Sequence, residues 1–176
     1  MASCSLLFFL WCSYFGFDLW LHRLNYGTFN GVVRSEASIP LNFYQSDGTT
    51  VQIQSLQHDY TILNFWSTIC GSSVRELPAV EELMGIYKNN PAIGVYGVHG
   101  WVEQLGENYA TGQQILSDEQ YSFPTFSINY KDPVLRELGV TGYPTVVILD
   151  KQGKIAFRGT IENAKRFMRN ILLLEI

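Results

Sequence analysis

From residue 39 onward, apolar runs of strand length alternate with segments whose apolar residues recur at helical spacing. The run 61–66 is apolar at nearly every position, which is typical of a strand covered on both faces of a sheet. Strands are expected at 41–45, 51–53, 61–66, 92–98, 123–128, 144–149 and 154–158. Helices are expected from 71 to 88, and at 105–121, 134–138 and 162–174. A strand–helix–strand order followed by a hairpin predicts an α/β domain with a central mixed sheet and helices on both faces.

The first part of the chain has a different pattern. Residues 6–21 are apolar or aromatic apart from Ser13, Gly16 and Asp18. A membrane-spanning helix needs roughly 20 apolar residues, so this run is of marginal length. It favours an N-terminal hydrophobic helix that anchors the chain in a membrane; an atypical signal sequence, or a helix packed on the domain or on a partner, stays open. The resulting division is a hydrophobic segment at 1–24, a linker at 25–38 and a domain at 39–176.

Charge and cysteine content narrow the function classes. The chain has 176 residues and a formal net charge of −4, which argues against nucleic acid as the main partner because phosphate contacts need a basic face. Its three cysteines are Cys4, Cys12 and Cys70, and the first two fall in the hydrophobic segment. We therefore expect no disulfide within the folded domain.

One cysteine lies where chemistry is expected. Cys70 follows the apolar strand 61–66 directly and precedes a helix, and the free N–H groups and dipole of a helix N-terminus favour a thiolate. A second thiol three residues later would complete a dithiol redox pair, but that position is Ser73. Ser73 either donates a hydrogen bond to the Cys70 thiolate or has a purely local backbone role.

No other motif points to a cofactor or a metal. The three histidines, at 22, 58 and 99, share no ligand spacing with the cysteines, and no phosphate-binding loop or dinucleotide fingerprint follows a strand. His99 and Trp101 are expected just past the end of the strand 92–98, where a satisfied structural histidine is the simpler interpretation. Three acidic residues of the helix after Cys70 are expected on a solvated face: Glu76, Glu81 and Glu82.

Three segments in order carry a family resemblance. They are Ile62–Trp66 leading into Cys70-Gly71, then Arg75-Glu76-Leu77-Pro78, and finally Gly142-Tyr143-Pro144-Thr145 before Asp150–Lys154. Together they resemble redoxin-like thioredoxin-fold proteins of the TlpA/ResA type. The resemblance implies a thioredoxin-like three-layer α/β/α sandwich, with Cys70 as the attacking cysteine and Pro144 as the cis-proline that faces it.

The same resemblance implies a substrate groove around Cys70, in which the backbone at Tyr143 pairs with an extended substrate. The groove residues that we expect are Trp66, Ile69, Gly71, Ser72, Tyr143 and Pro144. The chain departs from the family pattern at two of its positions. Ile69 stands where a Trp usually precedes the cysteine, and Ser73 stands where the second cysteine is expected.

The family also implies a domain displayed outside the cytosol on an N-terminal anchor. Arg23 and Arg34 lie after the hydrophobic segment, and by the positive-inside tendency they favour the opposite orientation. Two charges are weaker evidence than three ordered segments, so we expect the domain on the extracytoplasmic side.

The function expected is thiol–disulfide exchange, or capture of a partner as a mixed disulfide, by the single thiol of Cys70, with Ser73 beside it. The partner would be a protein thiol or disulfide, or glutathione. Two alternatives stay open. One is a redox-inactive binding or scaffold module, and the other is a one-cysteine peroxidase, for which Ser67 fits the position three residues before the cysteine but Leu63 does not fit the proline expected earlier.

Overall fold

The computed structural model describes residues 32–36, 40–53, 56 and 58–174. Its strands are β1 (Val32–Glu36), β2 (Asn42–Tyr44), β3 (Thr50–Gln52), β4 (Tyr60–Trp66), β5 (Ile93–Trp101), β6 (Thr125–Asn129), β7 (Thr145–Asp150) and β8 (Lys154–Gly159). Its helices are α2 (Gly71–Tyr87), α3 (Thr111–Asp118), α4 (Pro133–Glu137) and α5 (Ile161–Leu174), with a short 3-10 helix η2 (Glu103–Leu105).

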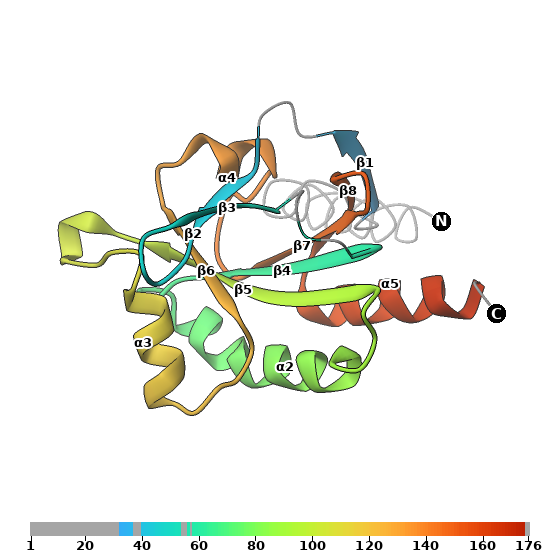
Figure 1. Ribbon diagram of the computed structural model, residues 1–176, viewed down its shortest axis with the longest axis horizontal. Coiled ribbons are helices and arrows are strands. Elements are labelled where there is room, and N and C mark those ends of the chain that lie inside the picture. The colour runs from blue at the N-terminus through green and yellow to red at the C-terminus, as the bar shows by residue number, and fades with distance from the viewer. Residues whose placement is uncertain (1–31, 37–39, 54–55, 57, 175–176) are drawn as a thin grey trace, which may run out of the picture.

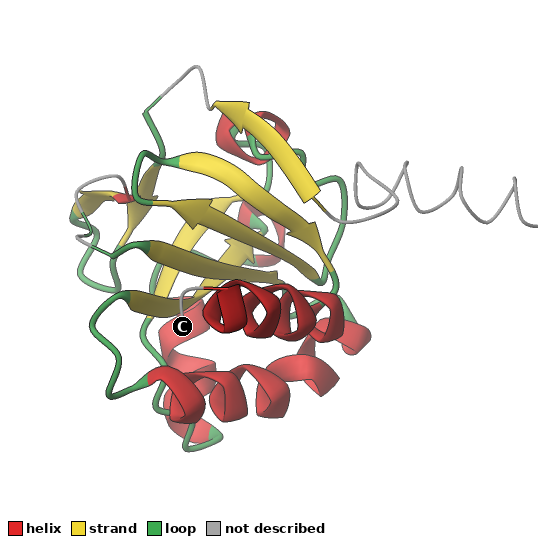
Figure 2. Ribbon diagram, turned by 90° about the vertical axis from the view of Figure 1, so that its right-hand side faces the viewer, coloured by secondary structure: helices red, strands yellow, loops and turns green. Residues whose placement is uncertain are grey.

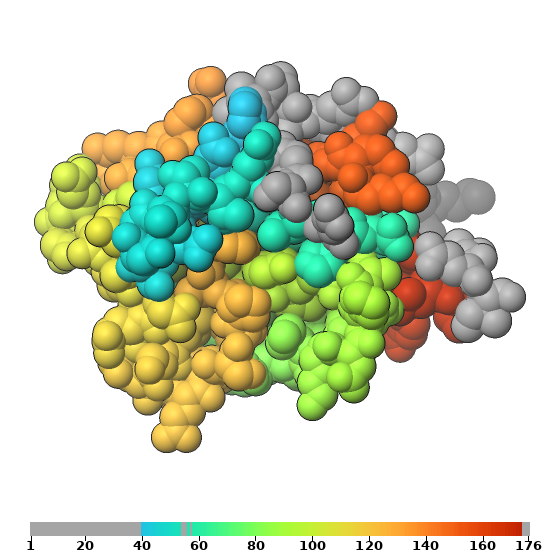
Figure 3. Space-filling model, viewed as in Figure 1, coloured from blue at the N-terminus to red at the C-terminus, as the bar shows by residue number. Residues whose placement is uncertain are grey.

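The strands form one mixed sheet in the order β1-β8-β7-β4-β5-β6-β2-β3. β4, β5 and β6 run parallel to one another, whereas β7 is antiparallel to β4 and to β8. The hairpin β2–β3 joins the sheet through β6 and forms part of the outer surface seen in Figure 3. The predicted mixed sheet is therefore correct, and β4, which leads to Cys70, lies near its centre.

Helices cover both faces of this sheet. α2, α3 and α5 lie on one face, and α4 lies on the other (Figures 1 and 2). Each face has its own core: Ile62 and Trp66 of β4 pack with Leu77 and Val80 of α2, whereas the other face packs against α4. The three-layer α/β/α arrangement that the family resemblance implied is confirmed.

The alternation of β4 explains both cores. Even-numbered residues of the strand face α2, and odd-numbered residues such as Leu63 and Phe65 face α4. Residues 61–66 are each no more than 4% exposed, because helices cover both sides. Continuous apolar sequence in a strand is what this double burial requires.

The sequence prediction and the structure differ most at β1, at α3 and at the end of β5. The segment 32–36, predicted as part of a linker, is strand β1, which pairs with β8. This antiparallel pairing is made by backbone groups, so it does not require an apolar pattern in the sequence. The helix expected at 105–121 is the short η2 followed by α3. The strand expected to end at residue 98 continues to Trp101, because its pairing with β6 extends to Asn129.

The predicted N-terminal hydrophobic helix, residues 6–21, lies outside the described residues. Among the helices that are described, none has the length and apolar character needed to cross a bilayer.

Candidate active site

Cys70 lies at the junction between the sheet and α2. It is the N-cap residue of α2, with extended backbone angles (φ −107°, ψ 98°), and its carbonyl accepts the first helical hydrogen bond from Val74 N at 3.2 Å. Its own amide donates to the carbonyl of Ser67 at 3.1 Å, which closes a tight turn between strand and helix. The thiol is free and partly exposed at the carboxyl end of β4.

The sulfur has two polar neighbours. Cys70 Sγ lies 3.1 Å from the hydroxyl oxygen of Ser72 and donates to the backbone carbonyl of Tyr143, also at 3.1 Å. The Tyr143–Pro144 peptide bond is cis. The thiol at the N-cap of α2 thus contacts the loop before β7, although the two residues are 73 positions apart in the sequence.

The surroundings of the sulfur lower the pKa of the Cys70 thiol. Partial burial opposes ionisation and acts to raise this pKa, but the nearby hydroxyls and backbone amides of Ser72 and Ser73 outweigh it. Ser73 is fully buried, and its hydroxyl has no hydrogen-bond partner of ordinary geometry in the described part of the chain. Both residues predicted as catalytic therefore lie together, one partly exposed and the other beneath it.

The predicted groove residues divide into two groups. Ile69 is 63% exposed, Gly71 and Ser72 are exposed, and Tyr143 and Pro144 are partly buried around the sulfur. Trp66 is 0% exposed, so its prediction as a groove residue is wrong. Trp66 is the last residue of β4, and because it is at an even-numbered position its side chain packs under α2 rather than beside the sulfur.

Two contacts support the loop that carries Cys70. The hydroxyl of Ser67 donates to the carbonyl of Gly100 in β5 at 3.2 Å. The carboxylate of Glu107 accepts from the hydroxyl of Thr68 and, at 2.8 Å, from the amide of Val102. The turn before the cysteine is thereby tied to the end of β5 from two sides.

The sequence analysis did not predict several polar side chains that are buried on the α2 side of the sheet. Asn64, Ser73, Glu76 and His99 each have at least one buried side-chain atom without a hydrogen-bond partner among the described residues. Glu76 was predicted on a solvated face, but it is half-buried. Residues 73, 76, 77, 80 and 83 lie on one face of the helix, so the helical spacing could have predicted that Glu76 lies on the buried face.

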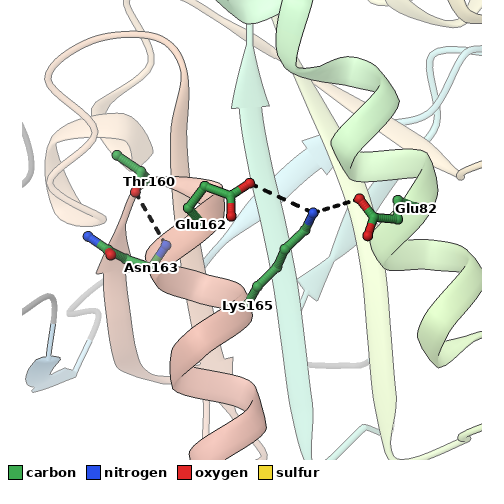
Figure 4. Close-up of polar contacts among 5 residues, drawn as sticks. All are labelled: Glu82, Thr160, Glu162, Asn163 and Lys165. Carbon is green, nitrogen blue, oxygen red and sulfur yellow. Dashed lines mark hydrogen bonds and ion pairs between the residues drawn. The ribbon is translucent and has the colours of Figure 1, made fainter.

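The pKa of Glu76 is raised to about 7, chiefly by burial and also by the negative charge of Glu162, while the positive charge of Lys165 acts to lower it. Figure 4 shows this lysine between two carboxylates, since Lys165 Nζ lies 2.8 Å from Glu82 and 3.8 Å from Glu162. Lys165 therefore links α5 to α2 next to the half-buried carboxyl. The described ranges hold no cluster of three or more residues suited to binding a metal ion.

Residues 36–158 match the AhpC/TSA family. The chain belongs to this family, which is a redoxin family of thioredoxin-fold proteins. The resemblance drawn from its three sequence segments is confirmed at the level of family and fold.

Relatives within this family include proteins named thiol-disulfide oxidoreductase ResA. The one from Halalkalibacterium halodurans is 29% identical over 117 residues, which are 65% of this chain and 62% of that protein. The one from Geobacillus thermodenitrificans is 26% identical over 164 residues, which are 87% of this chain and 90% of that protein.

Solved structures show the same fold. A thiol-disulfide oxidoreductase from Bacteroides fragilis superposes with a TM-score of 0.64 at 15% identity, covering 77% of this chain and 99% of that one. A thiol:disulfide interchange protein from Bacteroides sp. gives a TM-score of 0.63 at 15% identity, covering 80% and 90%. At this identity the likeness concerns the fold alone.

Proposed function

We propose that this protein uses the single thiol of Cys70 to form mixed disulfides with a partner protein or with glutathione. The observation that carries the proposal is the environment of the sulfur, which is partly exposed and hydrogen-bonded, with a lowered pKa. A thiolate that solvent reaches is the nucleophile of thiol–disulfide exchange.

The reaction proceeds in one exchange step. The Cys70 thiolate attacks one sulfur of a partner disulfide, and a new S–S bond forms between the two. The original S–S bond breaks, and its second sulfur leaves as a thiolate that takes a proton from solvent. Cys70 is oxidised and the leaving sulfur is reduced, so the electrons balance.

Ser73 determines the lifetime of the mixed disulfide. A cysteine three residues after the attacking one would resolve the mixed disulfide from within, but a hydroxyl cannot accept the sulfur. The adduct therefore persists until an external thiol attacks it. A long-lived covalent complex is the distinguishing expectation of this proposal.

Trapping in the native cell tests the proposal. Acid-quenched, non-reducing purification should recover disulfide-linked adducts from the wild type and none from Cys70→Ser. Ser73→Cys should shorten the lifetime of the adducts, whereas Ser73→Ala, the matched control, should leave them intact. If wild-type protein carries no adduct and its thiol is inert toward disulfides, the proposal fails and a binding module remains.

The peroxidase alternative has less support. The Ser67 hydroxyl, at the position that would serve a peroxidatic cysteine, is fully buried and donates to Gly100 instead. A direct assay of Cys70 with hydrogen peroxide separates this alternative from disulfide exchange, because only the peroxidase forms a sulfenic acid at a catalytic rate.

We further propose that residues 6–21 tether the domain to a membrane, with the domain on the extracytoplasmic side. The apolar sequence of this segment supports the tether. Alkaline carbonate should leave the full chain in the membrane fraction and extract a variant without residues 1–24. A membrane-impermeant maleimide should label Cys70 in intact spheroplasts and should not label the Cys70→Ser variant. If Cys70 is labelled only after lysis, the domain lies on the cytoplasmic side instead.

A further inference from the structure

An open groove adjoins the Cys70 site on the α4 side of the sheet. It has a volume of about 590 Å³, and its walls are residues 130–133, 135–136 and 140–143. Tyr143 belongs both to this groove and to the Cys70 site, because its carbonyl accepts from the thiol at 3.1 Å. Tyr143 therefore links the groove to the Cys70 site.

The groove combines an apolar floor with a basic rim. Leu135 and Val140 are almost fully buried in the floor, and the ring of Tyr130 is partly exposed beside them. Lys131 and Arg136 are exposed at the rim, and neither has a carboxylate within ion-pair distance among the described residues. The Lys131 ammonium lies 5.2 Å from the centre of the Tyr130 ring.

The one acidic wall residue is already engaged. Asp132 is the N-cap of α4, and its carboxylate accepts from the amide of Val134 at 2.9 Å. Its charge offsets only one of the two cations. The rim thus keeps a positive balance on a chain whose formal net charge is −4.

We propose that this groove gives the exchange its selectivity, favouring a partner whose extended segment carries an apolar side chain and an acidic one beside the reacting cysteine. The inference rests on the proposed exchange at Cys70. An extended chain advances about 3.3 Å per residue, so residues two and three positions from the bonded cysteine reach past Tyr143. There the apolar side chain meets the floor and the carboxylate meets Lys131 and Arg136.

The test uses cysteine peptides activated as 2-pyridyl disulfides. Cys70 attacks the peptide sulfur, the peptide becomes disulfide-bonded to Cys70, and 2-thiopyridone leaves with a measurable absorbance. The peptides Gly-Cys-Gly-Leu-Glu and Glu-Leu-Gly-Cys-Gly cover both chain directions, and each has a counterpart with Lys in place of Glu. At least one acidic peptide should react roughly fivefold faster than its basic counterpart at low salt, and the ratio should shrink in 0.5 M NaCl.

Charge reversal supplies the controls. Arg136→Glu should abolish or invert the preference, and Lys131→Glu should weaken it. Arg166→Glu makes the same charge change at an exposed position of α5 and should leave the preference unchanged. A variant whose far-UV circular dichroism departs from the wild type is set aside in favour of the other groove variant.

A small reagent separates the two proposals. If wild-type Cys70 reacts with 4,4′-dithiodipyridine but takes acidic and basic peptides at equal rates, the groove proposal is overturned and the proposed function stands. If Cys70 reacts with neither the reagent nor the peptides, the proposed function fails and the groove proposal falls with it. Persistence of the preference in both groove variants would also overturn the groove proposal.

Discussion

The phenol ring of Tyr143 occupies the space that a side chain at Gly100 would need. A Cβ at residue 100 would lie 2.1 Å from the Tyr143 hydroxyl oxygen and 2.6 Å from Cζ. The carbonyl of the same glycine accepts from Ser67, in the turn that leads to Cys70. One residue of β5 thus lies beneath both the turn before the thiol and the loop that faces it.

Gly100→Ala should therefore disturb the active site from below. The added methyl forces Tyr143 outward, which should cost about 1–3 kcal/mol of unfolding free energy and change the alkylation rate of Cys70. Gly85→Ala is the matched control, because a Cβ there meets nothing within 4 Å; in a helix interior it should gain about 0.5–1 kcal/mol. Denaturant titration measures both values.

A double-mutant cycle identifies the cause. In a Tyr143→Ala background the methyl at residue 100 has room, so most of the penalty of Gly100→Ala should disappear. An equal penalty in both backgrounds would mean that the methyl acts on something other than the tyrosine ring.

Alkylation of Cys70 as a function of pH should have its midpoint below that of an ordinary cysteine, because serine hydrogen bonds lower the pKa of this thiol. Ser72→Ala removes one of these bonds, at 3.1 Å, and should shift the midpoint upward. At pH 7 the rate with iodoacetamide should fall roughly two- to fivefold. Ser117→Ala, at an exposed position of α3, should change nothing. An unshifted midpoint in Ser72→Ala would assign the low pKa to Ser73 and the backbone amides at the start of α2 rather than to the Ser72 hydroxyl.

Local patterns predicted most of the fold because most elements bury one recognisable face. The apolar run ending at Trp66 predicted the central strand, and the turn at Asp150–Gly153 predicted the β7–β8 hairpin. β1 was missed because its partner, β8, lies more than a hundred residues away and the pairing uses backbone groups.

The sequence predicted the order of the site residues along the chain, but not which of their side chains are buried. The family resemblance implied that the loop at Tyr143 and Pro144 faces Cys70, and the thiol of Cys70 does contact the Tyr143 carbonyl. Which side chains are buried depends on how β4 packs against α2, and this packing places Trp66 in the core and leaves Glu76 half-buried. A family motif fixes the order of residues along the chain more firmly than the face on which each one lies.

Glu76→Gln should stabilise the protein above neutral pH. Burial raises the pKa of this carboxyl to about 7, well above its unfolded value, so the folded protein binds a proton that the unfolded chain releases. The wild type thus loses stability as the pH rises from about 4.5 to about 7. At pH 8 the glutamine variant should be more stable by about 1–2 kcal/mol, a value reduced for the part of the carboxyl that faces solvent, and the gain should vanish near pH 4.5.

Glu82→Gln is the control for this effect, because its exposed carboxylate pairs with Lys165 at 2.8 Å. Its loss should cost less than about 1 kcal/mol. Equal stability of Glu76→Gln and wild type at pH 8 would show that water reaches the Glu76 carboxylate in the folded protein.

His99 should change the free energy of unfolding over nearly the same pH range as Glu76, but with the opposite sign. The side chain is 0% exposed, neither ring nitrogen has a hydrogen-bond partner among the described residues, and the ring centre lies 4.8 Å from that of Trp66. Burial lowers the pKa of His99 to about 4, although Glu107 opposes the shift. As the pH falls below about 6.5, His99 of the unfolded chain binds a proton, whereas His99 of the folded protein stays neutral down to about pH 4. The folded protein therefore loses stability as the pH falls from 6.5 to about 4.

The two groups partly cancel in the wild type, so each must be measured without the other. In a Glu76→Gln background, the unfolding free energy should fall between pH 7 and pH 4 by about 2–3 kcal/mol more with His99 than with His99→Leu, because leucine has no proton to bind. The comparison of the two variants removes the contribution of other carboxylates, which titrate equally in both. A constant difference across this range would mean that His99 is protonated inside the folded protein, which would require a partner or water at its ring nitrogens.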